Sequence, residues 1–269
     1  MSRIITLLTD FGLQDGYVGA MKGVILRINP QAVLVDISHD IEAHDIMAGA
    51  LVLGSAYGCY PVGTIHVAVV DPGVGGQRRA IILETSQGYF VGPDNGIFTS
   101  IYDRETITRT VTIENPKFME PTVSQTFHGR DVFAPAAAYL SLGVDVELFG
   151  PPVETQMTVA FPRPRVTDDG AEGEVIYVDR FGNLITNISA DLYVRYVGAG
   201  NPGIRLVGQR VSGPYESYED GREGEVFGIF GSSGFLEVSM KEASAQEALG
   251  LGRGAAVHLF RSLSRGVEE

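Results

Sequence analysis

The stretch His66–Ala80, HVAVVDPGVGGQRRA, carries the strongest signals for both fold and chemistry. Its apolar first part predicts a buried strand, which Asp71-Pro72 ends because proline cannot donate a hydrogen bond to a neighbouring strand. A loop with three glycines then leads to Arg78-Arg79 and a second apolar run. An acid and a guanidinium therefore lie seven residues apart, at the carboxyl end of a strand, where ligands bind in open α/β sheets.

The glycine loop leaves two interpretations open. A phosphate-binding loop requires a helix directly after the glycines. Here the pattern returns to a strand, so we expect neither a Rossmann nor a Walker site. From this stretch alone, a strand turn closed by a surface salt bridge is as good an interpretation as a functional site.

The composition excludes several classes of protein. The formal net charge of −13 argues against a nucleic-acid partner, which would require a basic face. The single cysteine, Cys59, excludes an intrachain disulfide and a cysteine-rich zinc site, and we expect it to be buried on a helix. No apolar run approaches the length of a membrane span, so we expect no membrane partner and a cytoplasmic protein.

The first half of the chain alternates between two patterns. Apolar runs at Ile4–Leu8 and Ala32–Ile37 predict buried strands, while Tyr17–Ile28 and Asp45–Tyr60 have helical apolar spacing. Strands and helices in alternation are typical of a parallel α/β sheet. Asp10 follows the first strand, where a carboxylate can accept hydrogen bonds from a ribose diol; the alternative is a turn-former or helix cap.

Two later segments of this half place polar residues at expected turns. Gly92–Gly96, GPDNG, is a strong turn signal. Thr126–Asp131, TFHGRD, precedes a predicted helix, where His128 and Arg130 could bind an anion or a nucleophilic water. The alternative is that Asp131 caps this helix and that His128 is an ordinary loop residue.

The pattern changes at Phe161–Pro164, where two prolines separated by an arginine predict a stiff linker. We therefore expect an N-terminal α/β domain with a mainly parallel sheet over residues 1–162 and a smaller antiparallel β domain over residues 163–269. Short β-rich runs with frequent turns favour a sandwich or barrel for the second domain. These runs are Gly173–Val178, Leu184–Ile188, Ile204–Val207, Val226–Phe230, Phe235–Ser239 and Ala256–Phe260.

Three turns of the second domain carry residue types that bind ligands. Asp179–Asn183 combines an acid, a ring and an amide, and Gly231–Gly234 offers hydroxyls and backbone amides suited to a carboxylate. Tyr218 lies in an acidic loop with no obvious core to join. Each feature alone is more often an ordinary turn, but together they favour a binding site.

Taken together, the motifs resemble those of the S-adenosylmethionine hydroxide adenosyltransferases (S-adenosylmethionine hydrolases), relatives of the nucleophilic fluorinase and chlorinase. The resemblance covers nearly the whole chain and keeps the order of the motifs. These are LTDFG, DISHDI, VVDPGVG with the arginine pair, GPDNG, TFHGRDVFAPAAA, VDRFGNLITNI and IFGSSGFLEV. It implies an N-terminal α/β domain plus a small β domain, assembled as a homotrimer with each active site between neighbouring subunits.

The resemblance also implies a reaction. Family members cleave S-adenosylmethionine to adenosine and L-methionine, with water attacking the 5′ carbon of the ribose and with no cofactor or metal. Carried over to this chain, it implies a water-binding trio of Asp71, Arg78 and His128. The implied substrate contacts are Asp10 for the ribose hydroxyls, Asp179 for the methionine ammonium, Ser232 and Ser233 for its carboxylate, and Phe181, Asn183, Tyr218 and the backbone of Met240 and Glu242 for the adenine. Where relatives often carry a large aromatic residue, this chain has His44.

Such a reaction needs an activated water more than it needs an acid, because methionine leaves a sulfonium as a neutral sulfur. Arg78 would favour the hydroxide-like form of the water, His128 could take or share its proton, and Asp71 would mainly orient it. Alignment can supply about 7–11 kcal/mol, whereas a general base typically adds only about 10²–10⁴-fold. We therefore expect alignment to dominate.

Three alternatives stay open. A halogenase would bind a halide in place of water, although the Asp71 carboxylate would repel the anion. A metal-dependent phosphoesterase could gather acids and histidines at the strand ends, although these lack the fixed spacing of a helix-borne metal motif. A binding module could hold S-adenosylmethionine or adenosine without turnover. The candidate metal ligands are Asp10, Asp36, His39, His44, Asp45 and Asp71.

Overall fold

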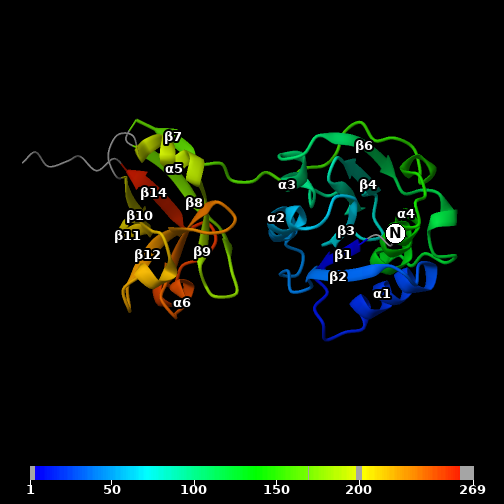
Figure 1. Ribbon diagram of the computed structural model, residues 1–269, viewed down its shortest axis with the longest axis horizontal. Coiled ribbons are helices and arrows are strands. Elements are labelled where there is room, and N and C mark those ends of the chain that lie inside the picture. Colours follow the sequence, from blue (N-terminus) through cyan, green and yellow to red (C-terminus); the bar gives the residue numbers. More distant parts are fainter. Residues whose placement is uncertain (1–3, 169, 198–201, 261–269) are drawn as a thin grey trace, which may run out of the picture. The chain divides into compact units, whose positions relative to one another are not determined.

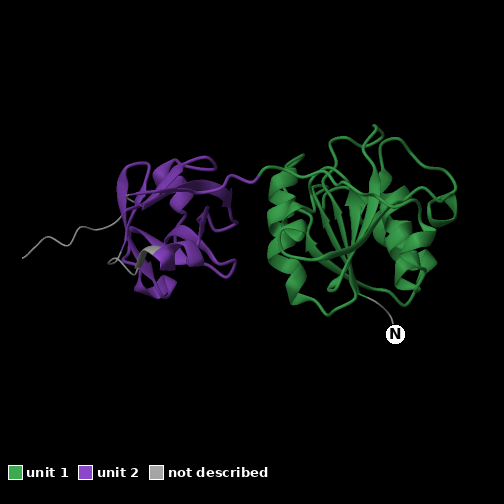
Figure 2. Ribbon diagram, turned by 90° about the horizontal axis from the view of Figure 1, so that it is seen from above, with its two compact units in different colours: residues 1–160 green, residues 161–269 purple. Residues whose placement is uncertain are grey.

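The computed structural model describes residues 4–168, 170–197 and 202–260. The chain divides into two compact units, Met1–Ala160 and Phe161–Glu269, which Figure 2 shows in different colours. None of the helices in the described ranges combines the length and the apolar character needed to cross a bilayer.

A six-stranded sheet forms the centre of the first unit, in the order β2-β1-β3-β5-β4-β6. The four strands β2, β1, β3 and β5 are parallel, whereas β4 and β6 join as antiparallel neighbours. The predicted parallel character therefore applies to one part of a mixed sheet. The strands are β1 (Ile4–Thr9), β2 (Val33–Ser38), β3 (Thr64–Val69), β4 (Ala80–Thr85), β5 (Gly88–Pro93) and β6 (Ile107–Thr112).

Helices cover both faces of this sheet (Figures 1 and 2). α1 (Tyr17–Ile28) and α4 (Ala134–Ser141) pack together on one face, and α2 (Ile46–Ala56) packs with the short α3 (Thr99–Tyr102) on the other. A five-residue π-helix, Gly129–Phe133, leads directly into α4. The first unit is thus layered helix, sheet, helix, as strands alternating with helices require.

The second predicted helix is shorter than its apolar pattern. α2 begins where the Asp45 side chain accepts a hydrogen bond from the Ala48 amide at 2.9 Å, and its last turn tightens into a 3-10 helix, Tyr57–Cys59. Cys59 is exposed there, so the prediction that it would be buried is wrong. It lies at the end of the helix, beyond the face that packs on the sheet.

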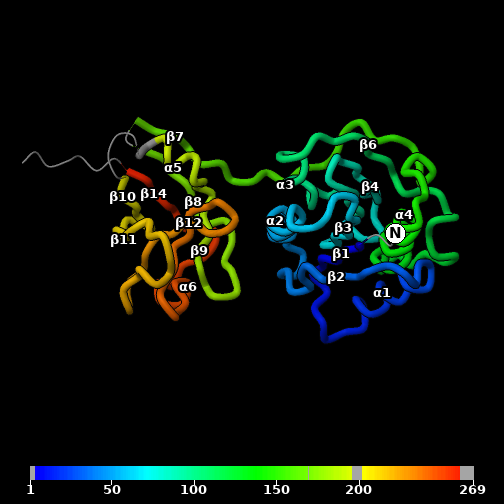
Figure 3. Tube along the Cα trace, in the orientation of Figure 1, coloured from blue at the N-terminus to red at the C-terminus, as the bar shows by residue number. Residues whose placement is uncertain are grey.

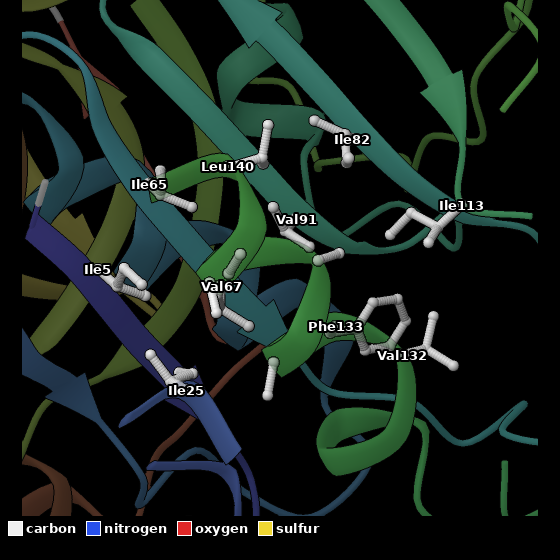
Figure 4. Close-up of a cluster of buried hydrophobic side chains, with 14 of the residues drawn as sticks. Ile5, Ile25, Ile65, Val67, Ile82, Val91, Ile113, Val132, Phe133 and Leu140 are labelled. Carbon is white, nitrogen blue, oxygen red and sulfur yellow. The ribbon is translucent and has the colours of Figure 1, made fainter. Parts of the chain in front are cut away.

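The main core lies between the parallel strands and the α1/α4 layer. Figure 4 shows strand residues such as Ile5, Val67 and Val91 meeting Phe133 and Leu140 from the helical segment. Each of these side chains is fully buried. Because β3 is buried along its whole length and Val70 after it is also buried, Asp71, two residues beyond the strand, starts from a rigid position.

The second unit is a closed barrel of seven strands. The ring runs β8-β9-β13-β12-β11-β10-β14 and closes where β14 pairs with β8. Figure 3 traces the path of the chain through these strands. A separate strand, β7 (Arg165–Thr167), pairs antiparallel with the first residues of β8. The barrel strands are β8 (Gly170–Val178), β9 (Leu184–Ser189), β10 (Gly203–Leu206), β11 (Gln209–Tyr215), β12 (Val226–Phe230), β13 (Phe235–Met240) and β14 (Ala256–Phe260), and two helices, α5 (Ala190–Val197) and α6 (Ala245–Leu249), lie between them in sequence.

The prediction of an antiparallel domain is correct for every neighbouring pair except one. β11 and β12 pair in parallel. A long connection over residues 216–225, containing a 3-10 helix, joins them, and a long connection allows the second strand to start at the same end as the first, whereas a hairpin would reverse it. Tyr218 lies in this connection.

Candidate active site

The predicted trio is in direct contact in the first unit. Asp71 lies just beyond β3, Arg78 just before β4, and His128 immediately before the π-helix. The Arg78 Nε atom donates to both Asp71 carboxylate oxygens at 3.0 Å, and Nη2 donates to Oδ2 at 2.5 Å. The same Nη2 lies 2.7 Å from His128 Nδ1. Residues 50 positions apart in sequence thus form one chain of hydrogen bonds.

Burial distinguishes this pair from a surface salt bridge. The side chains of Asp71 and Arg78 are only 4% and 11% exposed, and the guanidinium carbon lies 5.3 Å from the centre of the Phe133 ring. The interpretation of this stretch as a turn closed by a surface ion pair is therefore wrong. A buried pair with two parallel contacts holds its geometry far more strictly than an exposed one.

The contact with Arg78 determines the protonation of His128. A guanidinium can only donate, so Nδ1 is the acceptor and the neutral ring carries its proton on Nε2. Burial and the adjacent Arg78 charge lower the pKa of His128, while the charges of Asp71 and Asp131 act weakly in the opposite direction. His128 is therefore a neutral imidazole around neutral pH, with a basic nitrogen shared with Arg78.

The glycine loop packs against the segment that carries His128. Gly75 has φ +73°, and a Cβ atom there would lie 2.2 Å from the Gln125 carbonyl oxygen, so only glycine allows the two segments to approach this closely. A cavity of about 350 Å³ is lined by Arg78 and His128, but not by Asp71, together with apolar side chains such as Val123 and polar ones such as Gln77. There is room next to the trio for a water molecule and part of a ligand.

The alternative role of Asp131 as a helix cap is wrong. Asp131 lies inside the π-helix with its side chain 1% exposed. It accepts hydrogen bonds from Arg130 Nε at 2.6 Å and from the Ser124 amide at 2.8 Å. Burial raises its pKa, but these hydrogen bonds outweigh burial, and the net pKa is lowered. The charged Asp131 therefore fixes the loop that precedes His128.

Asp10 lies one residue after β1, with its side chain 8% exposed. Its Oδ2 accepts a hydrogen bond from the backbone amide of His44 at 2.9 Å. His44 itself has φ +69°, and its ring is 75% exposed. The position where relatives often carry an aromatic residue thus contacts Asp10 through its backbone and leaves its side chain in solvent.

The remaining predicted residues gather in the second unit around a cavity of about 750 Å³. Ser233 is not part of its lining, but its hydroxyl is buried and has no hydrogen-bond partner among the described residues. The Phe181 ring is 77% exposed at the rim. The predicted residues that line the cavity are Asp179, Phe181, Asn183, Tyr218, Ser232, Met240 and Glu242, joined by Glu237, Ala243 and Ser244.

The Asp179–Asn183 turn is held by the Asp179 carboxylate. Its Oδ1 accepts from the backbone amides of Phe181 and Asn183, both at 2.9 Å, and Oδ2 accepts from the Asn183 side-chain amide at 2.8 Å. These bonds orient Asp179 before any ligand binds, and they tie the predicted ammonium and adenine contacts to one another.

Glu237 is a cavity residue that the sequence did not reveal. It lies in β13, is 6% exposed, and its Oε2 accepts a hydrogen bond from the Tyr218 hydroxyl at 2.9 Å. Burial raises the pKa of Glu237, and the nearby Asp179 adds to this effect. Burial and the same bond raise the pKa of Tyr218 to about 12. The only signal in the sequence was an acid inside the apolar run FLEVS.

The six candidate metal ligands do not form one cluster. Asp36 binds Lys22 at 2.6 Å and His39 at 3.0 Å, Asp10 contacts His44, and Asp71 contacts Arg78. Within the described ranges, no group of three or more His, Cys, Asp or Glu side chains is placed to hold a metal ion.

Comparisons with known proteins agree over both units. The model of the SAM hydroxide adenosyltransferase N-terminal domain matches residues 5–150, and that of the C-terminal domain matches residues 173–258. A (R)-S-adenosyl-L-methionine hydrolase of Thermus thermophilus is 39% identical over 96% of this chain and 100% of its own length. A protein of the same name from Methanocaldococcus jannaschii is 42% identical over 70% of this chain and 68% of its own.

Two further similarities are informative. A fluorinase from Nocardia brasiliensis is 26% identical over 95% of this chain and 96% of its own, clearly less than the hydrolases. The crystal structure of an uncharacterized conserved protein from Thermotoga maritima superimposes with a TM-score of 0.90 and 35% identity, covering 96% of this chain and all of the other. From the two matching domain models and the full-length relatives, the chain belongs to the SAM hydroxide adenosyltransferase family.

Proposed function

We propose that this protein is an enzyme that hydrolyses S-adenosylmethionine to adenosine and L-methionine. The observation that carries the proposal is the buried Asp71–Arg78–His128 hydrogen-bond chain beside a cavity. A relative named as a hydrolase of this compound aligns over 96% of this chain, and a fluorinase aligns with lower identity.

The chemical step forms an O–C5′ bond and breaks the C5′–S bond of the sulfonium. The electron pair of that bond stays on sulfur, which leaves as the neutral thioether of methionine. The attacking water loses one proton. As negative charge develops on the water oxygen, the Nη2–H of Arg78 turns from His128 to stabilise it, and His128 Nδ1 then accepts the proton.

Asp71 acts on this step through Arg78. Its two oxygens hold the guanidinium in a fixed plane, so the donor that meets the developing oxyanion does not need to reorganise. A halide nucleophile would have to approach the same carboxylate, which favours water over chloride or fluoride.

The cavity of the second unit and Asp10 bind the substrate in this proposal. Asp10 takes the ribose hydroxyls, Asp179 takes the methionine ammonium, and Ser232 with Ser233 takes its carboxylate. The adenine lies near Phe181, Asn183 and Tyr218 and meets the backbone of Met240 and Glu242. The protein works as a homotrimer in which each active site combines residues of neighbouring subunits, and it needs no cofactor.

Chromatography of a reaction run in ¹⁸O-labelled water tests the function. We expect adenosine with the label in its 5′ hydroxyl, together with methionine. A parallel reaction with added chloride or fluoride should give no halogenated nucleoside. Bound but unconverted substrate after long incubation would instead identify a binding module, and a halogenated product would identify a halogenase.

A further inference from the structure

We propose that the turn Asp94-Asn95 positions Asp71 and Arg78 for reaction. It does so by holding Val70, which directly precedes Asp71, and Arg79, which directly follows Arg78. The proposal rests on the function proposed above. It concerns the GPDNG motif, which so far has no role in the site.

The sheet order places this turn between the two strands that carry the pair. β5 lies between β3 and β4, and its last residue, Pro93, pairs with Ala80 at the start of β4. Asp71 follows β3 and Arg78 precedes β4, so both lie just outside the regular ladders. The chain leaving β5 is the segment that can reach both of them.

Asn95 holds the β3 side. Its side-chain Nδ2 donates to the Val70 carbonyl oxygen at 2.8 Å, and Val70 directly precedes Asp71. Its Oδ1 accepts from the Ile97 amide at 3.2 Å, which fixes the orientation of the side chain. The position of the peptide that leads into Asp71 therefore depends on Asn95.

Asp94 holds the β4 side. Its backbone amide donates to the Arg79 carbonyl oxygen at 2.9 Å. Its carboxylate, 1% exposed, accepts from the Arg79 guanidinium through Nε at 2.8 Å and through Nη2. Its other oxygen accepts from the Met157 amide at 2.8 Å. Arg79, which directly follows Arg78, is thus bound through both backbone and side chain.

The loop that connects the pair cannot set this geometry by itself, because it contains three glycines between Asp71 and Arg78 and glycine leaves the backbone free. The two ends must therefore be held from outside. A displacement of about 1 Å in a reacting group can cost about 100-fold in rate, whereas one hydrogen bond contributes only about 1 kcal/mol to stability. Loss of the Asn95 contact should affect turnover more than folding.

The chain provides a matched control. Asn115 makes the same pair of bonds elsewhere in the first unit: Nδ2 donates to the Leu148 carbonyl at 2.8 Å, and Oδ1 accepts from the Lys117 amide at 3.1 Å. Asn95→Ala and Asn115→Ala remove the same bonds and add no charge. We expect Asn95→Ala to lower kcat by about 10–100-fold with KM within about threefold, and Asn115→Ala to change neither by more than about twofold.

A second readout does not depend on activity. Arg78 lowers the pKa of His128, so movement of Arg78 in Asn95→Ala should raise the pKa of the His128 ring, followed by NMR and assigned with His128→Gln. Asn115→Ala should leave it unchanged. If Asn95→Ala does not fold, Asp94→Asn is measured in its place, because an amide can still accept from Met157 but attracts Arg79 less.

The wild-type reaction is measured first, so that absence of hydrolysis, which would refute the proposed function, is distinguished from failure of this proposal. Equal kcat values for Asn95→Ala and Asn115→Ala, or an unchanged His128 titration in Asn95→Ala, would overturn the role of the turn.

Discussion

The two groups of predicted site residues, one in each unit, differ in how their charges are balanced. In the first unit, the carboxylate of Asp71 is neutralised by Arg78, which also contacts His128. In the second, the cavity lining contains the acids Asp179, Glu237 and Glu242 and, among the described residues, no lysine or arginine. The first group is balanced without a ligand, whereas the second has an excess of acidic side chains that a cationic ligand would offset. A sulfonium with an α-ammonium group supplies that charge.

This difference suggests a division of labour. Asp71 and Arg78 lie near the ends of buried strands, and His128 precedes a buried helical segment. Such positions keep the side chains in one geometry, which the alignment of a water molecule requires. The cavity lies among turns of the barrel, where Asp179 organises a hairpin and Tyr218 lies in a long connection. Changes in the trio should therefore affect turnover, and changes in the cavity should affect substrate binding.

The largest effect should come from Arg78→Ala. We expect kcat to fall by about 10³-fold with a small change in KM, because the donor that stabilises the oxyanion is lost. Steady-state kinetics on adenosine formation measure both constants. Arg109→Ala is the control, since Arg109 also binds a carboxylate, that of Glu84 at 2.6 Å, and it should remain within about twofold of wild type. Near wild-type turnover in Arg78→Ala would show that the trio is misassigned.

The scaffold of the first unit should weaken in acid through His66. Its ring is 2% exposed and bonded to Thr6 at 2.8 Å, and burial lowers the pKa of His66 to about 4. As pH falls, His66 therefore binds its proton in the unfolded chain before it does so in the folded chain. The contribution of neutral His66 to the free energy of unfolding is complete above the unfolded pKa and is lost as pH falls toward about 4.

Between pH 7.5 and 5 the loss due to His66 should be about 2 kcal/mol. Urea unfolding of wild type and His66→Gln at both pH values measures it, because the amide does not titrate and the other groups cancel in the difference. The same loss in both proteins would contradict the assignment. Glu237 in the second unit should have the opposite pH dependence. Its pKa is raised, so its contribution to the free energy of unfolding is present below the unfolded pKa and is lost as pH rises.

Asp179→Asn should act mainly on binding. Removing a charged partner of the substrate ammonium should raise KM by about 10–100-fold, with a smaller change in kcat, as measured by initial rates over a range of substrate concentrations. Asp145→Asn is a suitable control, because Asp145 also accepts a backbone amide in a turn, that of Glu147 at 3.1 Å, but lies in the first unit. A fall in kcat at constant KM in Asp179→Asn would reverse the proposed division.

These regions also differ in how far the sequence could predict them. The α1 and β12 ranges follow from apolar periodicity and from the residues that stop it, and the structure agrees. β3 is also where the apolar run predicts it, although it ends at Val69, one residue before the predicted end at Val70. The contact between Asp71 and Arg78 could be expected because a short glycine loop joins them. The barrel strand β11 was missed because Ser212, Gly213 and Pro214 interrupt its pattern.

Other features depend on tertiary contacts that no local pattern encodes. Closure of the barrel requires β14 to meet β8, about 85 residues earlier in the sequence. The Glu237 carboxylate becomes a cavity group only because the 216–225 connection brings Tyr218 to it. The protonation of His128 is set by Arg78, which lies 50 residues earlier in the loop before β4. In each case, the sequence names the residue type but not its partner.

The acid side of the pH–rate profile should report His128. Because burial and Arg78 lower the pKa of His128, kcat should stay level as pH falls through the ordinary histidine range and should then drop about tenfold per pH unit. Protonation at Nδ1 removes both the base and the contact with Arg78. An acid limb at or above the ordinary histidine pKa, or no limb at all, would contradict the assignment.

The smallest expected effect is an activity about fourfold below wild type, in a mixture of two variants. It would show that the two regions belong to one site formed between subunits. Arg78→Ala has an intact cavity and Asp179→Asn an intact trio, so each alone has low activity at low substrate concentration. If they are refolded together in equal amounts, a trio from one variant meets a cavity from the other at about a quarter of the sites of a mixed symmetric trimer.

Mixed refolding should therefore restore about a quarter of wild-type activity, while each variant refolded alone stays at its own level. A control mixture of Arg78→Ala with His128→Ala should gain nothing, because both variants lack the trio. If each site were formed within one chain, mixing Arg78→Ala with Asp179→Asn would also gain nothing, because every chain would keep its own defect. The experiment thus separates a shared site from two sites that happen to lie on the same chain.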